Sequence, residues 1–309
     1  MSSLSIQGLF RKTKLFSSIE KLTPYLFILP AGLFLMAIMG YPILYAIFMS
    51  FQKFTLATLV SKQTEFIGFE NYRRVLANPQ FMVALKHSLI FTFVSIFFQF
   101  MIGLGLAILF SKTFPMRNTM RGLLLSGWQI PSVVTGTIFL WLFNIDYGLV
   151  NFVLTSAHLI TEPIGWVTQA NTALTTVIIV NIWLGIPFNT IMLTAGITSL
   201  PEDVYEAATV DGANGWQRLI YITIPLLRST ILAVLMLGFI YTLRVFDVIW
   251  IMTKGGPANA TEVLPTFAYR LSFITFNFGQ SAAVSVIILS ILLVAAIIYL
   301  KFAFREENV

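Results

Sequence analysis

The stretch from Ser199 to Arg228, SLPEDVYEAATVDGANGWQRLIYITIPLLR, is a polar segment with long apolar runs on both sides. Ser199 and Glu202 have the spacing of a capping box. Pro201 falls in the first turn, where its missing N–H costs nothing. The pattern therefore predicts a helix that begins near residue 202.

A second helix is predicted within the same stretch. Gly212 can adopt the left-handed conformation that ends many helices, so the first helix should end there. Asn214 and Gln217 repeat the cap spacing, and Pro225 marks the return to an apolar run. Two polar helices between apolar runs predict a water-exposed element that another molecule holds.

The composition indicates an integral membrane protein. Hydrophobic residues make up 57% and charged residues 10% of the 309 residues, and the mean hydropathy is +0.85. Soluble domains carry roughly 25% charged residues. We expect an all-α membrane fold, because a helix satisfies its own backbone hydrogen bonds in lipid.

Six apolar windows are long enough to cross a bilayer, which takes about 20 helical residues. They predict spans at 24–51, 86–111, 122–144, 172–198, 229–252 and 279–302. Residues 22–52 carry no charge, which is too long for a cleaved signal and fits a retained first span. The balance of Lys and Arg predicts that residues 1–23, the 199–228 loop and residues 303–309 are cytoplasmic.

Other function classes lack their characteristic residues. The chain has no cysteine and only two histidines, far apart, so we expect neither disulfides nor a metal site. The net charge of +6 is not concentrated in a basic, aromatic-rich cluster, so no nucleic-acid partner is expected. The phosphate-binding pattern G-x-x-x-x-G-K-[ST] is missing, so any ATP must be hydrolysed by another chain. An intramembrane enzyme is disfavoured because no catalytic Ser/His or paired-Asp arrangement is present.

The first outer loop, residues 53–85, alternates aromatic and charged residues around Phe66, Phe69 and Tyr72. This pattern predicts a short helix at the membrane interface. It could seal the lipid interface or contact an external partner.

Polar side chains within predicted spans mark a candidate pathway, because such groups are costly in lipid. The candidates on the fourth span are Asn181, Trp183, Gly185 and Asn189, around a Pro187 that should kink the helix. On the fifth span, Tyr241, Thr242, Arg244, Val245 and Asp247 lie just before the Gly255-Gly256-Pro257 turn. An amide beside an aromatic ring suits a sugar, whose hydroxyls need hydrogen bonds and whose C–H face fits a ring.

Arg244 and Asp247 are one helical turn apart, which leaves two interpretations. The two side chains could form a local ion pair. Alternatively, Arg244 could face the pathway and bind a carboxylate or phosphate of the substrate.

The ordered motifs resemble one known family. They are Glu206-Ala207-Ala208, Gly212, Ile222 and Ile224-Pro225; Phe246-Asp247 through Thr253-Lys254-Gly255-Gly256-Pro257 and Ala260-Thr261; Phe66-Ile67-Gly68 with Asn71-Tyr72; Leu29-Pro30-Ala31; and Tyr41-Pro42. The set is similar to the membrane subunits of bacterial ABC importers and closest to the maltose-type sugar permeases, whose EAA loop corresponds to residues 199–228. Ile224 replaces the usual Leu, and Arg228 a frequent later proline.

This resemblance implies the type I ABC importer fold, with six transmembrane helices and a cytoplasmic coupling helix. It implies a cytoplasmic-membrane location, a second related permease, two ATPase subunits and an external sugar-binding protein as partners. ATP and Mg would be bound by the ATPases and no cofactor by this chain. Contact with the ATPases is expected at Glu202, Tyr205, Glu206, Ala207, Ala208, Asp211, Gly212 and Ala213. The resemblance implies substrate contacts at Asn181, Gly185, Gly238, Tyr241, Thr242 and Val245, to which the chemistry of Arg244 adds one candidate.

The sequence leaves alternatives for the transported solute and its driving force. The importer could carry a neutral di- or oligosaccharide, or an acidic sugar or sugar phosphate if Arg244 binds the substrate. An ion-coupled secondary transporter would show inverted repeats and several acidic residues at mid-membrane depth. No repeat is visible and only Asp247 lies deep in a predicted span, so the ATP-driven importer is favoured.

Overall fold

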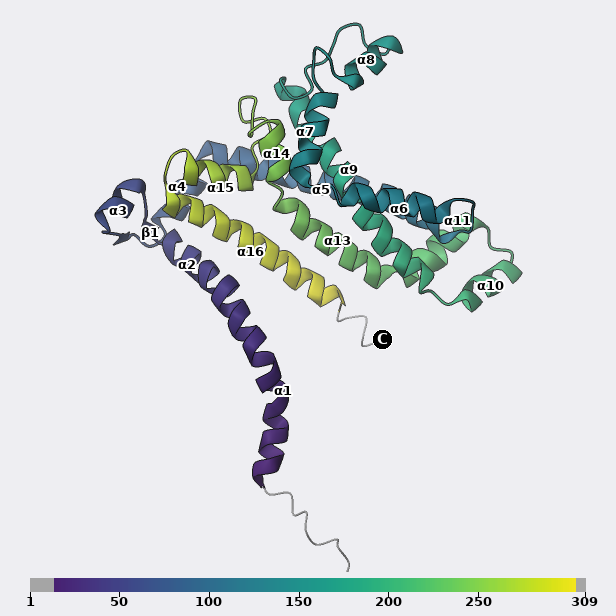
Figure 1. Cartoon of the computed structure of the whole chain (residues 1–309), viewed down its shortest axis with the longest axis horizontal. Helices are drawn as coiled ribbons and strands as arrows, with labels where there is room; N and C mark the ends of the chain where they lie inside the picture. The colour runs from purple at the N-terminus through teal and green to yellow at the C-terminus, as the bar shows by residue number, and fades with distance from the viewer. Residues whose placement is uncertain (1–13, 304–309) are drawn as a thin grey trace, which may run out of the picture.

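The computed structural model describes residues 14–303, most of which are helical (Figure 1). The first half contains α1 Lys14–Leu35, η2 Met36–Gly40 (a π-helical turn), α2 Tyr41–Ser50, β1 Gln52–Lys53, α3 Leu56–Ser61, β2 Glu65–Phe66, α4 Glu70–Leu76, α5 Pro79–Ser111, α6 Arg117–Trp128, α7 Ser132–Leu142 and α8 Leu149–Ser156. The second half contains α9 Ala170–Thr198, α10 Glu202–Val210, α11 Gly215–Arg218, η3 Leu219–Thr223 (π-helical), α12 Ile224–Leu226, α13 Arg228–Leu243, α14 Asp247–Met252, α15 Leu264–Phe273 and α16 Phe278–Ala303.

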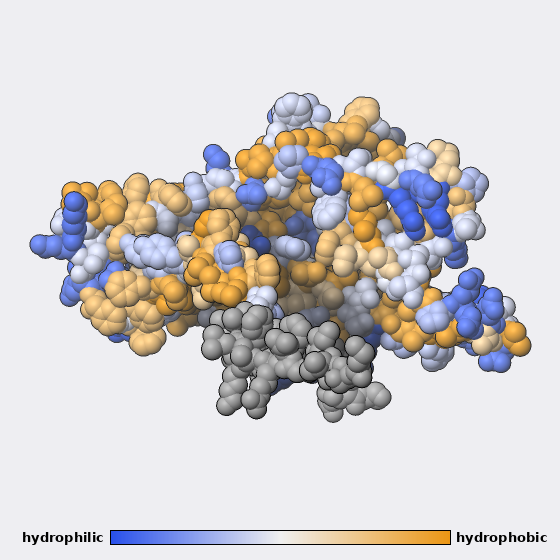
Figure 2. All heavy atoms as spheres, turned by 60° about the horizontal axis from the view of Figure 1, so that its bottom comes forward, coloured by the Kyte–Doolittle hydropathy of each residue, from blue (hydrophilic) through white to orange (hydrophobic). Residues whose placement is uncertain are grey.

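Five helical segments of the described chain are long and apolar enough to cross a membrane. They are Thr23–Ser50, Pro79–Ser111, Ala170–Thr198, Arg228–Met252 and Phe278–Ala303. A sixth candidate is the pair α6 and α7, which is bent by 96°. In Figure 2, hydrophilic residues gather at both ends of the visible face, and hydrophobic residues cover much of the surface between them. This distribution fits a bundle whose middle lies in lipid.

The predicted span over 122–144 is divided into two helices, with the kink at Trp128 and Pro131 that the sequence suggests. Helix α6 ends at Trp128, and α7 begins at Ser132 in a new direction. Pro131 explains the break, because it has no N–H for a helical bond and disfavours helical geometry at the residue before it. Pro131 itself has φ −55° and ψ 140°, outside the helical region.

Helix α5 is the centre of the bundle. Its residues contribute to all three buried apolar clusters: Phe81 and Ala84 pack with α15 and α16, Phe91 with α9 and α14, and Leu104 with α9 and α13. Gly103 permits the closest approach of α5 to α9, since an added Cβ would lie 2.6 Å from the Cβ of Asn189. Small residues at such contacts let helix backbones approach closely in membranes.

The segment Thr23–Ser50 stands away from the bundle and meets it only near its C-terminal end, where α2 packs beside α16 (Figure 1). Its most apolar part has no buried residue within the chain. Lipid or another subunit must therefore cover this helix.

The loop between the first two candidate spans contains the short helices α3 and α4 and the antiparallel pair β1–β2, so a short helix is present there, and its position at the membrane interface stays a prediction. Asn71 anchors α4, because its amide donates to the carbonyls of Ser50 (2.9 Å) and Gln52 (2.8 Å). Hydrogen bonds from Arg73 and Arg74 lower the pKa of the half-buried Glu70 carboxyl to about 2. This loop lies at the opposite end of the bundle from α10 and α11 (Figure 1).

Candidate substrate cavity and 199–228 loop

The 199–228 loop contains two helices, as its sequence predicts, but the first is capped differently. Ser199 is the C-cap residue of the preceding helix α9, and its hydroxyl donates to the carbonyl of Gly196 at 2.8 Å. Pro201 occupies the cap position of α10, which has no side-chain cap bond. The predicted capping box of Ser199 and Glu202 was therefore wrong. Helix α9 extends to Thr198, so Ser199 caps the C-terminus of α9 and not the N-terminus of α10.

The turn between α10 and α11 is formed as predicted. Gly212 has φ +77°, in the left-handed region that favours glycine. Asn214 accepts from the N–H of Gln217 at 2.9 Å, and Gln217 accepts from the N–H of Asn214 at 2.8 Å. The second capping box is therefore confirmed.

Side-chain bonds join α10 to the segment that follows it. The Tyr205 hydroxyl lies 2.9 Å from the hydroxyl of Thr223, and Arg218 donates to the Thr209 hydroxyl at 3.1 Å. Ala208 is buried beneath these contacts. The two helices are thus braced as one unit that can move as a rigid body.

The outer face of this unit is open. Of the residues predicted to contact a partner there, Glu202, Glu206, Ala207, Asp211 and Gly212 are exposed, Tyr205 and Ala213 are half-buried and Ala208 is buried. Large apolar side chains are also exposed on it, with Val210 at 88% and Trp216 at 69% of full exposure. Such a face on a braced element is typical of a docking surface.

A cavity of about 440 Å³ lies among α5, α6, α7, α9 and α13. Its lining consists of Gln99, Trp128, Ile130, Ser132, Asn181, Leu184, Gly185, Phe188, Asn189, Gly238, Tyr241, Thr242 and Val245. Six of the seven predicted substrate positions lie together in this lining, and Arg244 is the exception. The folded chain thus assembles residues from two predicted spans into one site.

Asn181 supplies a free hydrogen-bond donor to the cavity. Its side chain is 4% exposed, and its Nδ2 has no hydrogen-bond partner within the described residues. A buried polar group without a partner costs about 1–3 kcal/mol. A ligand in the cavity with a hydroxyl or carboxylate oxygen would remove this cost.

Gly185 was expected to contact the substrate, and in the structure it also makes room for a neighbouring side chain. An added Cβ would lie 2.2 Å from Cδ of Gln99, so the glycine makes room for this side chain. The Gln99 amide then donates to the carbonyl of Asn181 at 2.8 Å, which ties α5 to α9. Gly185 therefore positions Gln99 and Asn181.

The aromatic part of the cavity is formed by Trp128, Phe188 and Tyr241. Phe188 lies between the other two, with ring centres 6.2 Å from Trp128 and 5.9 Å from Tyr241. Trp183, the aromatic neighbour expected from the sequence, packs on Phe139 and does not line the cavity. The prediction for Trp183 was wrong because α9 turns this residue to another face.

Sequence reasoning missed Trp128, Ile130 and Ser132, which line the cavity around the break between α6 and α7. Pro131 is the signal in the sequence that could have placed a cavity wall at this position.

Arg244 and Asp247 form no ion pair with each other in the described structure. Helix α13 ends at Leu243, so the two residues are not on one helical turn. Asp247 instead accepts from the hydroxyl of Ser132 at 3.0 Å, and this bond links α14 to the cavity wall. Arg244 is exposed, and no hydrogen bond or ion pair is found for it within residues 14–303.

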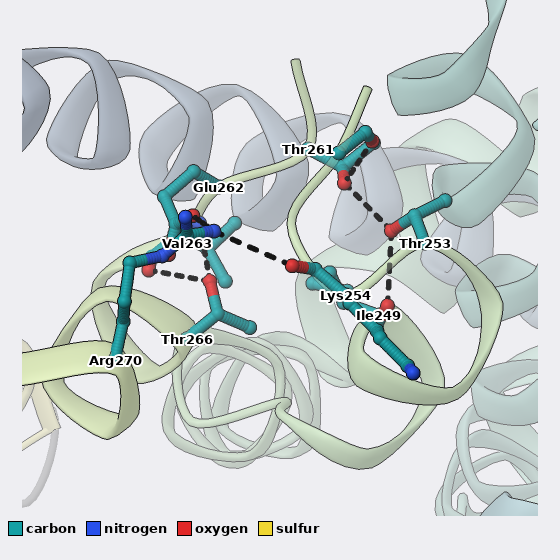
Figure 3. A network of polar contacts seen from close by, with 9 residues as sticks. Ile249, Thr253, Lys254, Thr261, Glu262, Val263, Thr266 and Arg270 are labelled. Atoms are coloured by element: carbon teal, nitrogen blue, oxygen red, sulfur yellow. Dashed lines mark hydrogen bonds and ion pairs between the residues drawn. The ribbon is translucent and has the colours of Figure 1, made fainter. Parts of the chain in front are cut away.

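The loop that follows α14 is held by a buried carboxylate (Figure 3). Glu262 is 1% exposed and paired with Arg270, which also donates to the carbonyl of Lys254 at 3.4 Å. Burial raises the pKa of the Glu262 carboxyl above its ordinary value, and Arg270 opposes this rise. Gly255 has φ +85° and leaves no room for a Cβ, which would lie 2.5 Å from Oε2 of Glu262. The Glu262–Arg270 pair thus fixes the loop that follows α14.

A scan against family models matches residues 99–307 to the binding-protein-dependent transport system inner membrane component family. The chain belongs to this family. It is therefore a permease subunit of ABC importers with the type I transmembrane fold.

Curated relatives agree with this assignment. The permease is 32% identical to the diacetylchitobiose uptake system permease protein DasB of Streptomyces coelicolor over 93% of this chain and 88% of the relative. It is 32% identical to the trehalose/maltose transport system permease protein MalF of Thermococcus litoralis over 78% of this chain and 81% of the relative.

A solved structure shares the fold. It is a chain of a bacterial ABC transporter involved in the import of the acidic polysaccharide alginate, with a TM-score of 0.80 and 24% identity. The match covers 95% of the permease and 99% of that chain.

Proposed function

We propose that this permease forms half of the translocation pathway of an ATP-driven, binding-protein-dependent importer of a di- or oligosaccharide. The observation that carries the sugar assignment is the unpartnered Asn181 amide in a membrane-embedded cavity with an aromatic wall. A sugar offers hydroxyls to the amide and an apolar C–H face to the rings. The diacetylchitobiose and trehalose/maltose systems of the relatives support the same class of substrate.

In this proposal the permease pairs with a second, related permease, and both chains engage ATPase subunits that bind ATP and Mg. The braced 199–228 loop is the contact with an ATPase, since it presents an exposed face with Glu206, Val210 and Trp216. ATP binding would draw the two ATPases together and displace this loop as a rigid body. The cavity would then open outward to receive sugar from the binding protein, and hydrolysis would return it to the inward-facing state.

The proposed orientation places both termini and the 199–228 loop in the cytoplasm. The distribution of Lys and Arg supports it. The first outer loop and the Glu262–Arg270 loop would then face the binding protein.

An acidic sugar or sugar phosphate is a second candidate substrate, favoured by the exposed and unpaired Arg244 of the described structure. This residue lies three positions beyond Tyr241, next to Val245 in the cavity lining. A guanidinium there could bind a substrate carboxylate or phosphate at the cavity mouth.

Uptake into proteoliposomes tests the proposal. The permease is reconstituted with its partner permease, the ATPases and the binding protein, and ATP-dependent uptake of radiolabelled disaccharides and acidic oligosaccharides is measured. We expect uptake only with ATP and the binding protein. Uptake by the permease alone, driven by an ion gradient, would refute the proposal.

A further inference from the structure

A second cavity, of about 510 Å³, lies between the 199–228 loop and the ends of α5 and α9. It is separate from the substrate cavity and shares no lining residue with it. We propose that this cavity binds the phosphate headgroup of an anionic membrane phospholipid. The proposal rests on the orientation given above, which puts the ends of α5 and α9 at the inner leaflet.

Two cations line the cavity without a carboxylate partner. Lys112, at the end of α5, has no hydrogen bond from its ammonium group within residues 14–303. Arg218, at the end of α11, donates one bond to the neutral hydroxyl of Thr209 and keeps further N–H donors. Glu202 also lines the cavity but pairs with neither cation in this part of the chain, so the lining has a net positive charge.

Neighbouring arginines show that this positive charge is not needed to cap α5. Arg117 donates to the carbonyl of Lys112 at 3.3 Å, and Arg121 donates to the carbonyl of Phe110. These two guanidinium groups already satisfy carbonyls at the negative end of the helix. The ammonium of Lys112 thus stays available for an anion.

The remaining lining suits a lipid better than a free phosphate. Ile108, Ile197 and Leu200 form an apolar wall next to helices that enter the bilayer. The opposite wall is the π-helical turn η3, through Leu219 and Thr223. A phospholipid carries an anionic headgroup on an apolar body, which matches the cationic rim and the apolar wall. Basic pockets between transmembrane helices on the cytoplasmic side are typical headgroup sites.

A bound lipid at this place would touch both the loop and the bundle. Tyr205 lines the cavity and bonds to Thr223 at 2.9 Å, so the headgroup would lie against the brace between α10 and η3. The membrane composition would thereby influence the element proposed to receive the motion of the ATPases.

Native mass spectrometry of the assembled transporter, released from nanodiscs that contain phosphatidylglycerol and phosphatidylcholine, tests this inference. We expect phosphatidylglycerol to remain bound. Lys112→Gln and Arg218→Gln should each lower the ratio of lipid-bound to lipid-free complex about fivefold, and together about 25-fold. The matched control is Lys301→Gln, because Lys301 lies near the end of α16 and does not line the cavity; it should leave the ratio unchanged.

Four results would overturn the assignment. Equal retention of phosphatidylcholine would show that the cavity does not distinguish lipids by headgroup charge. An equal drop of the lipid-bound ratio in Lys301→Gln would show nonspecific electrostatic attraction. Displacement of the lipid by millimolar inorganic phosphate would indicate a free-anion site. Lipid retained by the isolated permease but not by the assembled transporter would mean that a partner subunit fills the cavity. Because the readout is binding and not uptake, its failure is distinguishable from failure of the proposed sugar transport.

Discussion

The 199–228 loop and the substrate cavity differ in how their residues come together. The loop is built from contiguous sequence, and its turn, cap and brace all lie between Tyr205 and Thr223. The cavity takes its lining from five helices, from Gln99 to Val245. A local change should therefore disable the loop completely, whereas the cavity should lose function in steps.

The largest effect is expected from Gly212→Pro. Proline fixes φ near −65°, which is incompatible with the φ of +77° at this turn, so α10 and α11 would lose their relative positions. We expect uptake of radiolabelled sugar in membrane vesicles to be abolished while the permease remains inserted.

Gly215→Pro is the matched control. Gly215 is the first residue of α11, where proline is tolerated, and Asn214 before it is already extended, with ψ 169°. Uptake should therefore be retained. Equal loss in both variants, or normal uptake in Gly212→Pro, would contradict the rigid-loop interpretation.

A graded effect is expected in the cavity from Asn181→Ala and Tyr241→Ala. Removal of the free amide takes away one hydrogen bond to the sugar, which is about a tenfold loss of apparent affinity. Tyr241→Ala removes part of the aromatic wall, and the Phe188 ring remains. Stimulation of the ATPase by the loaded binding protein should persist in both variants.

The control for the amide is Asn118→Ala, which removes an exposed amide on α6 outside the cavity. Measurement of uptake over a range of sugar concentrations separates affinity from maximal rate. An unchanged apparent affinity in both cavity variants would show that the substrate binds elsewhere.

The same contrast explains what the sequence could predict. The helix end at Gly212 and the cap of Asn214 depend on neighbours within three residues, so their patterns were sufficient. Ser199 was misassigned because two helices compete for it, and only the length of α9 decides between them. The fold class followed from composition, because lipid admits few backbone arrangements.

The cavity was only partly predictable, because hydrophobic windows do not record the direction in which a helix faces. Six of the predicted positions lie in one lining, yet Trp183 turns away and Trp128 turns in. Pro131 signals a break, but the size of the 96° bend there and the end of α13 before Arg244 depend on packing between distant segments. A single apolar window cannot reveal them.

A smaller effect, on stability, is expected from Gly185→Ala. The new Cβ would overlap Gln99, and overpacking of this kind typically costs about 1–3 kcal/mol. Gly105→Ala is the control, since no atom lies within 4 Å of its added Cβ. Thermal unfolding in detergent should show a lower midpoint for Gly185→Ala alone; similar midpoints for both variants would mean that Gln99 can move away without cost.

The smallest effect is expected from Arg244→Gln if the sugar is neutral. Arg244 is exposed and does not line the cavity, so the apparent affinity for a neutral disaccharide should change less than about twofold, below the roughly 1 kcal/mol of one hydrogen bond. An acidic sugar held by the guanidinium would instead lose about tenfold or more, since hydrogen bonds to charged groups contribute about 1.5–3 kcal/mol. Arg244→Lys keeps the charge without the fork geometry and should fall between the two for an acidic substrate. Uptake assays of the three forms with a neutral and an acidic oligosaccharide therefore identify the charge of the cargo. A loss of apparent affinity for the neutral sugar in Arg244→Gln would show that the substrate site includes residue 244.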